Sequence, residues 1–233
     1  MLEQIDESLW LIEGGLVNFY GFPYPTRSVI ARLASGELWV WSPVRLTAAL
    51  REAVDALGAV RHLVSPNKIH HLFLKDWQVA YPEAQLWGPA STIRKRSDLV
   101  FREPLEDRPP AEWIWDIDQA WFQGSLFLDE IVFLHKPSRT VIVGDLIEAF
   151  SDEFLHKHWG GWKSFVARLD GITLAKPGAP REWRLSFVRR APARAARDKV
   201  LAWNCERVVM AHGEWQRTDG HAFLERALAW LGK

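Results

Sequence analysis

The sequence predicts one α/β domain over residues 1–233, folded as a four-layer α/β/β/α sandwich. Two blocks of strand-like segments are each accompanied by helix-like segments, and a buried strand and an amphipathic helix close the chain. With 48% hydrophobic and 25% charged residues, the chain has the composition of a globular protein with a sizeable core. The alternative is a doubly wound open sheet, but no G-x-G-x-x-G pattern follows the first expected strand.

The first half of the chain alternates expected strands with expected helices. Residues 8–14 have the apolar density of a strand, and residues 27–44 are typical of a hairpin that turns at Ser35 and Gly36. A helix is expected over 45–58, where a regularly spaced apolar stripe ends at a glycine suited to a C-terminal cap. The segments that follow are an expected strand at 61–65, a helix at 69–80 and a short strand at 84–89.

The second half begins with strands and continues with helices. Segment 113–124 is typical of a strand, and segment 130–147 of a hairpin that turns at the residues KPSR. Residues 151–204 are expected to be mostly helical, with interruptions at two glycines and at the residues KPGAP. A last strand at 207–214 and a helix at 219–231 complete the pattern.

The composition argues against several classes of protein. Lys and Arg number 29, and so do Asp and Glu, so the zero formal net charge disfavours a dedicated nucleic-acid binder. Cys205 is the single cysteine, which excludes an intrachain disulfide and favours a reducing compartment. The acidic first residues do not resemble a signal peptide, and no segment approaches the ~18 apolar residues of a membrane span. A cytoplasmic protein without nucleic-acid or membrane partners is expected; its oligomeric state is left open.

Histidine and aspartate side chains follow three of the expected strands. His70 and His71 come after the strand at 61–65, Asp145 ends the run VIVGD, and His212 ends the run VVMAH. Functional sites in α/β sheets gather outside the carboxyl ends of the strands. Imidazole and carboxylate are ligands that zinc and ferrous iron accept. These residues are therefore candidate metal ligands.

This order of elements and motifs resembles the metallo-β-lactamase superfamily, and within it the DUF4336 branch, whose motifs are similarly degenerate. The superfamily signature Thr-His-x-His-x-Asp-His follows a strand, and here segment 65–71 reads Ser-Pro-Asn-Lys-Ile-His-His. Gly144-Asp145 is similar to the strand-Gly-Asp pattern of the bridging aspartate, and His212 to the final histidine. The middle histidine has no counterpart in the stretch GSLFLDE. The resemblance implies an αββα sandwich with a metal site at the edge between its sheets.

The departures from the family pattern imply that one of two metal sites is lost. The first metal's signature positions are Pro66 and Lys68 here, and its middle histidine is missing. The second metal's positions all carry capable ligands. The resemblance therefore implies one divalent metal, zinc in preference to iron, held by His70, His71, Asp145 and His212.

The leading hypothesis is a metal-dependent hydrolase with a single metal site, acting on an unknown small-molecule substrate. Such a metal would lower the pKa of its water toward ~7, with Asp145 as ligand and candidate proton acceptor. Lys68 would bind a substrate oxyanion in place of the lost metal, or it is an ordinary exposed lysine.

Two other hypotheses stay open. Four protein ligands close a tetrahedral zinc site, which suggests a catalytically inactive binding or interaction protein with at most a structural metal. Iron in the same site would instead suggest redox or oxygen chemistry.

Several further residues are secondary candidates. Glu130 is either a carboxylate of the pocket or a glutamate beside a turn, and Glu214 either orients an imidazole or is solvated. Tyr20, Phe22 and Tyr24 form either an apolar wall near the site or a packed turn. The basic segment RRAPARAARDK is expected to be a helix with a solvated arginine face.

Overall fold

A computed structural model describes residues 2–232; Met1 and Lys233, the two ends of the predicted domain, lie outside the described residues. The strands are β1 (Leu2–Asp6), β2 (Leu9–Phe19), β3 (Phe22–Arg32), β4 (Leu38–Trp41), β5 (Val60–Val64), β6 (Gln85–Trp87), β7 (Ile117–Phe122), β8 (Glu130–His135), β9 (Thr140–Val143) and β10 (Arg207–Met210). The helices are α1 (Ala48–Asp55), α2 (Leu74–Ala80), α3 (Ala90–Lys95), α4 (Asp152–Phe154), the π-helical η1 (Leu155–Trp159), α5 (Gly160–Asp170), α6 (Arg181–Leu185), α7 (Arg190–Ala202), α8 (Gly220–Ala227) and the 3-10 turn η2 (Ala229–Leu231).

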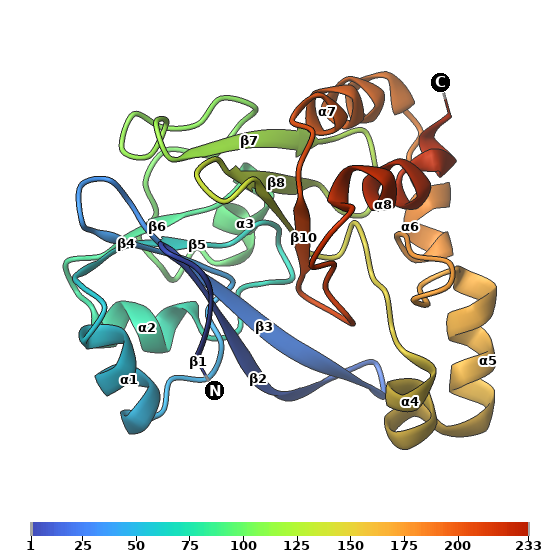
Figure 1. Cartoon of the computed structure of the whole chain (residues 1–233), viewed down its shortest axis with the longest axis horizontal. Helices are drawn as coiled ribbons and strands as arrows, with labels where there is room; N and C mark the ends of the chain where they lie inside the picture. The colour runs from blue at the N-terminus through green and yellow to red at the C-terminus, as the bar shows by residue number, and fades with distance from the viewer. Residues whose placement is uncertain (1, 233) are drawn as a thin grey trace.

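Two sheets form the centre of the molecule (Figure 1). The first has the strand order β1-β2-β3-β4-β5-β6, and the second has the order β10-β9-β8-β7. Strands β4, β5 and β6 run parallel to one another, as do β9 and β10. Parallel neighbouring strands end at the same edge of their sheet, so the residues that follow them lie close together.

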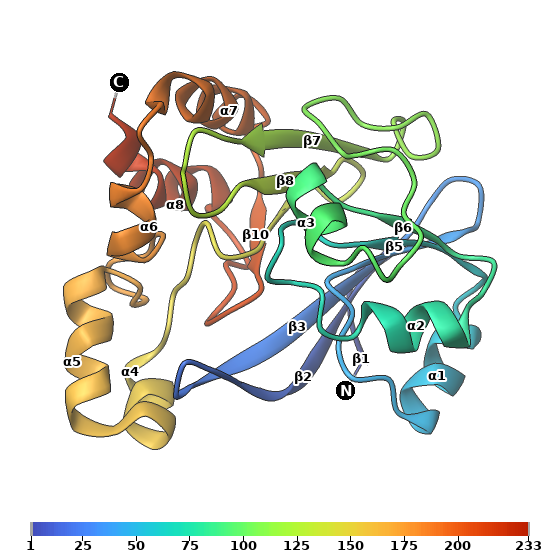
Figure 2. The ribbon, with the colours of Figure 1, turned by 180° about the vertical axis from the view of Figure 1, so that it is seen from behind.

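Three apolar cores separate four layers. The core between the sheets contains Trp39 and Trp41 of the first sheet and Phe133 and Ile142 of the second, all fully buried. Helices α1 and α2 pack on the outer face of the first sheet, which Figure 2 shows from behind. Helices α6, α7 and α8 pack on the outer face of the second. The predicted four-layer α/β/β/α sandwich is confirmed.

Strands β2 and β3 form a hairpin and extend into residues 15–26, beyond the strands expected at 8–14 and from residue 27. The hairpin turns at Tyr20 and Gly21, so β3 begins at Phe22 and includes Pro23 and Pro25. Proline is normally excluded from strands because it lacks an N–H. Strand β4 pairs with β3 only over residues 29–32, so the two prolines lie where one edge of β3 has no partner strand, a position that tolerates proline.

The helix expected over 69–80 begins only at Leu74, so His70 and His71 lie in a turn. The side chain of Asn67 explains the difference: its Oδ1 accepts hydrogen bonds from the backbone N–H groups of Ile69, at 2.8 Å, and His70, at 3.2 Å. Asparagine side chains that bond to nearby backbone groups favour turns over helix.

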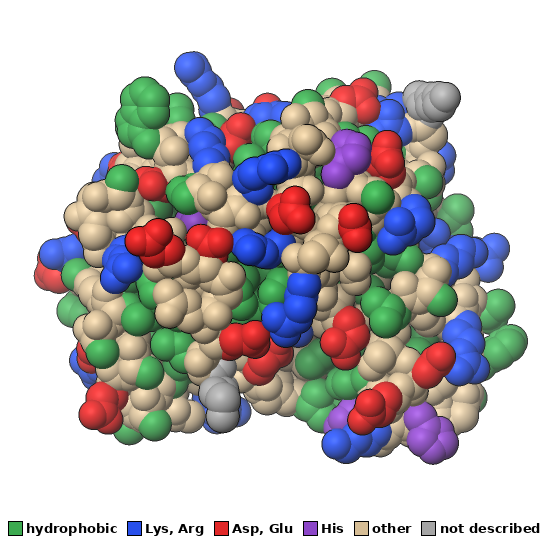
Figure 3. Space-filling model, viewed as in Figure 1, with side chains coloured by type: hydrophobic (Ala, Val, Ile, Leu, Met, Phe, Trp, Pro, Cys, Tyr) green, Lys and Arg blue, Asp and Glu red, His purple; other side chains and the backbone are tan. Residues whose placement is uncertain are grey.

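The surface carries both signs of charge. On the face that Figure 3 shows, Lys and Arg side chains are mixed with Asp and Glu, in keeping with the zero formal net charge. Within residues 2–232, no helix is both long and apolar enough to cross a membrane.

Candidate metal centre

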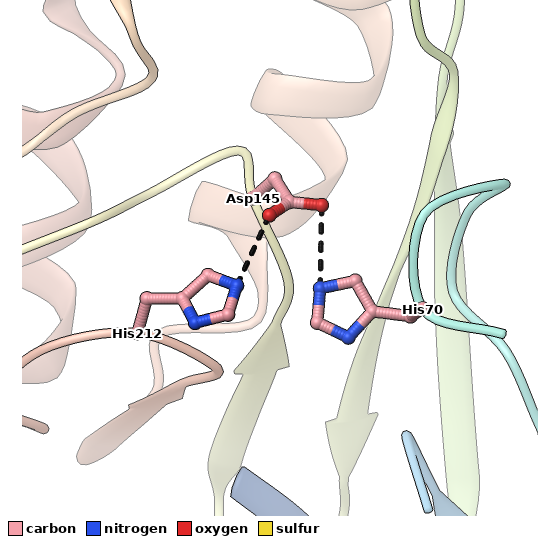
Figure 4. Close-up of side chains that lie close together, drawn as sticks. All are labelled: His70, Asp145 and His212. Atoms are coloured by element: carbon pink, nitrogen blue, oxygen red, sulfur yellow. Dashed lines mark ion pairs between the residues drawn. The ribbon is translucent and has the colours of Figure 1, made fainter. Parts of the chain in front are cut away.

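Three side chains that are distant in sequence meet at one edge of the sandwich (Figure 4). Nε2 of His70 lies 3.2 Å from Oδ2 of Asp145, and Nε2 of His212 lies 3.2 Å from Oδ1 of the same carboxylate. One ligand atom from each residue falls within 4.8 Å of the others. In the described part of the chain, no other group of histidine, cysteine or acidic residues meets this criterion.

The ends of three strands place these side chains. His70 follows β5 in the first sheet, whereas Asp145 and His212 follow β9 and β10 in the second. Strands β9 and β10 are parallel neighbours with Val143 opposite Met210, so residues just beyond their carboxyl ends lie side by side. The site therefore bridges the two sheets.

Asp145 is held by Glu130, which is fully buried at the start of β8. Oε1 of Glu130 accepts hydrogen bonds from the backbone N–H groups of Gly144 and Leu146, and Oε2 accepts from that of Asp145. Nδ2 of Asn67 donates to both Oε2 of Glu130 and Oδ2 of Asp145, at 2.8 Å each. One buried carboxylate thus fixes the loop after β9 and links it to the turn after β5.

Gly144 is required by this arrangement. A Cβ atom added there would lie 2.9 Å from Oε2 of Glu130 and 3.2 Å from Nδ2 of Asn67. The strand-Gly-Asp pattern therefore has a local physical reason: the buried carboxylate approaches the backbone too closely for a side chain.

Both histidines use Nδ1 for an orienting contact. Nδ1 of His212 lies 2.7 Å from the carbonyl oxygen of Pro25, which can only accept, so this nitrogen carries the proton. Nδ1 of His70 lies 2.7 Å from Oγ of Ser42. Each ring is thereby turned so that its Nε2 faces Asp145, as in the supporting contacts of metal-binding histidines.

The charges of the cluster shift its pKa values. Burial lowers the pKa of His70, but the adjacent carboxylate of Asp145 outweighs burial and the net shift is upward. Burial raises the pKa of Asp145, yet His70 and His212 together hold it well below its usual range. Asp145 is therefore ionised at neutral pH, which suits a ligand better than a proton acceptor.

The structure does not bring His71 or Lys68 into this cluster. The backbone oxygen of His71 accepts from Nη1 of Arg96, and its Nδ1 lies 3.4 Å from the same atom. Burial and the charges of Lys95 and Arg96 lower the pKa of His71 to about 4. Lys68 places its Nζ 5.4 Å from the centre of the Phe127 ring. Their assignments as ligand and oxyanion-binding residue stay predictions.

A cavity of about 460 Å³ opens beside the three side chains, within the size range of small-molecule sites. His70, Asp145 and His212 line it, and so does His71. Tyr20, Phe22 and Tyr24 also line it, so the aromatic residues at the turn between β2 and β3 and at the start of β3 contribute a wall. The edge of the Tyr24 ring contacts His212, with ring centres 5.0 Å apart.

Sequence reasoning missed one residue of the site and left a second one open. In the signature, Asn67 occupies a variable position, and the sequence around Glu130 permits two interpretations. The available signal for Glu130 was its place at the head of EIVFLH, a run whose six residues are all buried. A glutamate that opens such a run requires several hydrogen-bond donors.

Comparisons with known proteins show the family and the fold of the chain. A family model described as "Domain of unknown function (DUF4336)" matches residues 7–156, which contain His70 and Asp145 but not His212. No curated protein matches the sequence.

The fold is similar to that of solved metallo-β-lactamases. The DIM-1 enzyme exposed to ceftazidime has a TM-score of 0.67 and 14% identity, covering 99% of this chain and 95% of that one. An enzyme from Pontibacter korlensis has a TM-score of 0.65 and 12% identity, covering 99% and 98%. FIM-1 from Pseudomonas aeruginosa in its mono-zinc form has a TM-score of 0.63 and 12% identity, covering 99% and 94%. The predicted resemblance in fold is confirmed.

Proposed function

The chain belongs to the DUF4336 family, and on this premise we propose that it is a metal-dependent hydrolase with one metal ion held by His70, Asp145 and His212. The observation that carries the proposal is the pair of 3.2 Å approaches of imidazole Nε2 atoms to the two oxygens of one carboxylate. A fold similar to metallo-β-lactamases supports it.

The imidazole nitrogens that face Asp145 are arranged to bind a cation. Nε2 of His70 is buried and, among the described residues, has no hydrogen-bond partner, although Oδ2 of Asp145 lies 3.2 Å away. The neutral form of His212 carries its proton on Nδ1, so its Nε2 presents a lone pair to Oδ1 of the ionised carboxylate. Lone pairs facing a carboxylate repel it, and a shared cation removes this repulsion.

Three donors and an adjoining cavity favour an open site. A catalytic zinc has three protein ligands and keeps a position for water or substrate, whereas a structural zinc has four. His71, the fourth predicted ligand, is not in the cluster. When bound, the metal would supply Lewis acidity and an acidified water. This supports the catalytic hypothesis over that of an inactive protein with a structural metal.

The chain's own residues prepare the site for such chemistry. Asn67 and Glu130 fix Asp145, while Ser42 and the Pro25 carbonyl orient the imidazoles. The Tyr24 ring packs against His212 and so supplies an apolar surface on one side of the cluster.

We propose a single metal because the neighbouring positions offer no ligand set. Pro66 contributes only its carbonyl, which accepts from the backbone of Ile131, and Lys68 contacts Phe127. The mono-zinc FIM-1 structure is a solved example of one zinc on a similar fold. We propose zinc as this metal, although two histidines and a carboxylate also suit ferrous iron.

Elemental analysis of the purified chain tests the proposal. We expect about one zinc ion per chain, lost in His70→Ala and in Asp145→Asn but retained in His156→Ala, a matched control on the exposed part of η1. Loaded protein should then hydrolyse members of an ester and phosphodiester panel, and Asp145→Asn should not. A chain that binds no metal under metal-replete conditions would refute the proposal; iron in place of zinc would redirect it to oxygen chemistry.

A further inference from the structure

The cavity beside the candidate metal centre contains a second group of carboxylates. Glu148, Asp170 and Glu182 all line it. Glu148 lies in the segment after β9, three positions beyond Asp145, while Asp170 ends α5 and Glu182 lies on α6. The cavity therefore joins two polar sites through largely apolar walls.

Glu148 is buried but incompletely bonded. Its exposed fraction is 2%, and its carboxylate makes one hydrogen bond within residues 2–232, a 3.5 Å contact from the hydroxyl of Tyr24 to Oε2. A buried carboxylate normally has several donors or a positive partner, as Glu130 has four. The carboxylate oxygens of Glu148 can therefore accept further hydrogen bonds from a molecule in the cavity.

Positive side chains near the cavity do not neutralise Glu148. Arg27 donates hydrogen bonds to Glu13, at 2.7 Å, and to two backbone oxygens. Lys95 lies near His71. Arg184 and Arg181 offset part of the charge of Asp170, to whose backbone oxygen Arg184 donates. Burial first, and then Asp145, Glu182 and Asp170, raise the pKa of Glu148, with no arginine or lysine opposing them, so beyond its one hydrogen bond its carboxyl gains stabilisation in the ionised form only from a cation in the cavity.

The spacing of these carboxylates favours an organic cation over a metal ion. Metal ligands must converge on one point, and among the described residues only His70, Asp145 and His212 do so. An ammonium group on a larger molecule needs only one close carboxylate and can use aromatic faces for the rest.

Tyr24, which contacts Glu148, belongs to a cluster of aromatic rings, and both Tyr24 and Trp159 line the cavity. The Tyr24 ring packs against Trp159 and Phe150, with ring centres 5.5 and 5.6 Å away. The same ring contacts His212, so a single tyrosine connects the candidate metal centre with Glu148. At the mouth, Tyr20 and Phe127 are exposed and also line the cavity.

We propose that this part of the cavity is a subsite for the ammonium group of the substrate, with Glu148 as its counter-ion and Tyr24 and Trp159 as its aromatic walls. The inference rests on the proposed function: the substrate is an amine-bearing molecule with an apolar body whose hydrolysable bond reaches the metal. The acidic side chains Asp170 and Glu182 add to the attraction for a cation at this end.

Calorimetric titration of the full chain with probes that share an eight-carbon chain tests the subsite. The probes are octyltrimethylammonium, which cannot coordinate a metal, neutral octanol and anionic octanoate, each below its micelle-forming range. We expect the ammonium probe to bind at least about tenfold more tightly than octanol, and octanoate to bind least. Glu148→Gln should remove most of this preference while leaving octanol binding unchanged.

Two variants complete the design. Glu153→Gln, on the exposed face of α4, is the matched control and should keep the full preference. Glu182→Gln should reduce the preference about threefold, which keeps the test decisive if Glu148→Gln does not fold. Equal binding of octanol and the ammonium probe, or an unchanged preference in both cavity variants, would overturn the proposal. Titrations with and without chelator distinguish the two proposals. A protein that binds the ammonium probe but no metal would support the subsite and refute the proposed hydrolase function.

Discussion

Replacing Glu130 by glutamine should show how much the candidate metal centre depends on one buried carboxylate. Both oxygens of Glu130 accept two hydrogen bonds, from Gly144 and Leu146 on Oε1 and from Asn67 and Asp145 on Oε2. Glu130→Gln keeps the size of the side chain but replaces one oxygen with an NH2 group. Whichever way the amide turns, two buried donors then face a donor instead of an acceptor.

The expected loss follows from those two donors. Each buried donor left without a partner costs about 1–3 kcal/mol, so the pair costs about 2–6 kcal/mol. We expect the free energy of unfolding to fall by about 3 kcal/mol, out of a total of about 5–15 kcal/mol for an ordinary domain. At a denaturant slope of about 2 kcal/mol per M, the urea midpoint would fall by about 1.5 M.

Urea denaturation of the chelator-treated protein measures this loss, and a zinc competition titration measures its effect on the site. We expect zinc affinity to fall by about 10–100-fold, because Glu130 supports Asp145 without binding the metal itself. Glu214→Gln, an exposed glutamate two positions beyond His212, is the control and should change neither quantity. A Glu130→Gln protein within about 0.5 kcal/mol of the wild type would refute this reasoning.

Three other outcomes are expected. Gly144→Ala should cost about 1–3 kcal/mol and weaken zinc binding, because the new methyl group would lie 2.9 Å from Oε2 of Glu130; unchanged thermal unfolding would contradict the close approach. His71→Ala should keep zinc affinity within about twofold, whereas His70→Ala should abolish binding; equal losses in the two proteins would restore His71 as a ligand. Zinc affinity should rise with pH: Asp145 outweighs burial and raises the pKa of His70, so below that pKa zinc must displace a proton, and above it the affinity should level off. Competition titrations between about pH 6 and 8.5 check this, and a flat profile would count against His70 as a ligand.

The layers of the fold could be predicted because strand and helix patterns alternate clearly along the chain. The strand ends also identified His70, Asp145 and His212, since carboxyl ends of parallel strands converge on one edge. The pattern predicts a helix over 69–80, whereas the helix begins only at Leu74. Its apolar spacing is helical, but the bonds that Asn67 makes with the backbone hold the first residues in a turn.

Other parts of the site could not be predicted from sequence. The four donors of Glu130 come from two separate segments, so their convergence appears only in three dimensions. His70 and His71 are equivalent in a linear motif, and the local turn alone decides which of them faces Asp145. The extension of β3 through two prolines depends on where β4 stops pairing, which no local pattern reveals.

The last strand, β10, joins the second sheet beside β9, and His212 follows it close to the end of the chain. During synthesis on a ribosome, His70 and Asp145 emerge well before this histidine, so a nascent chain has at most two of the three donors. A chain truncated after α7 would therefore lack both the strand and the final donor of the proposed metal site, and we expect it to bind no zinc.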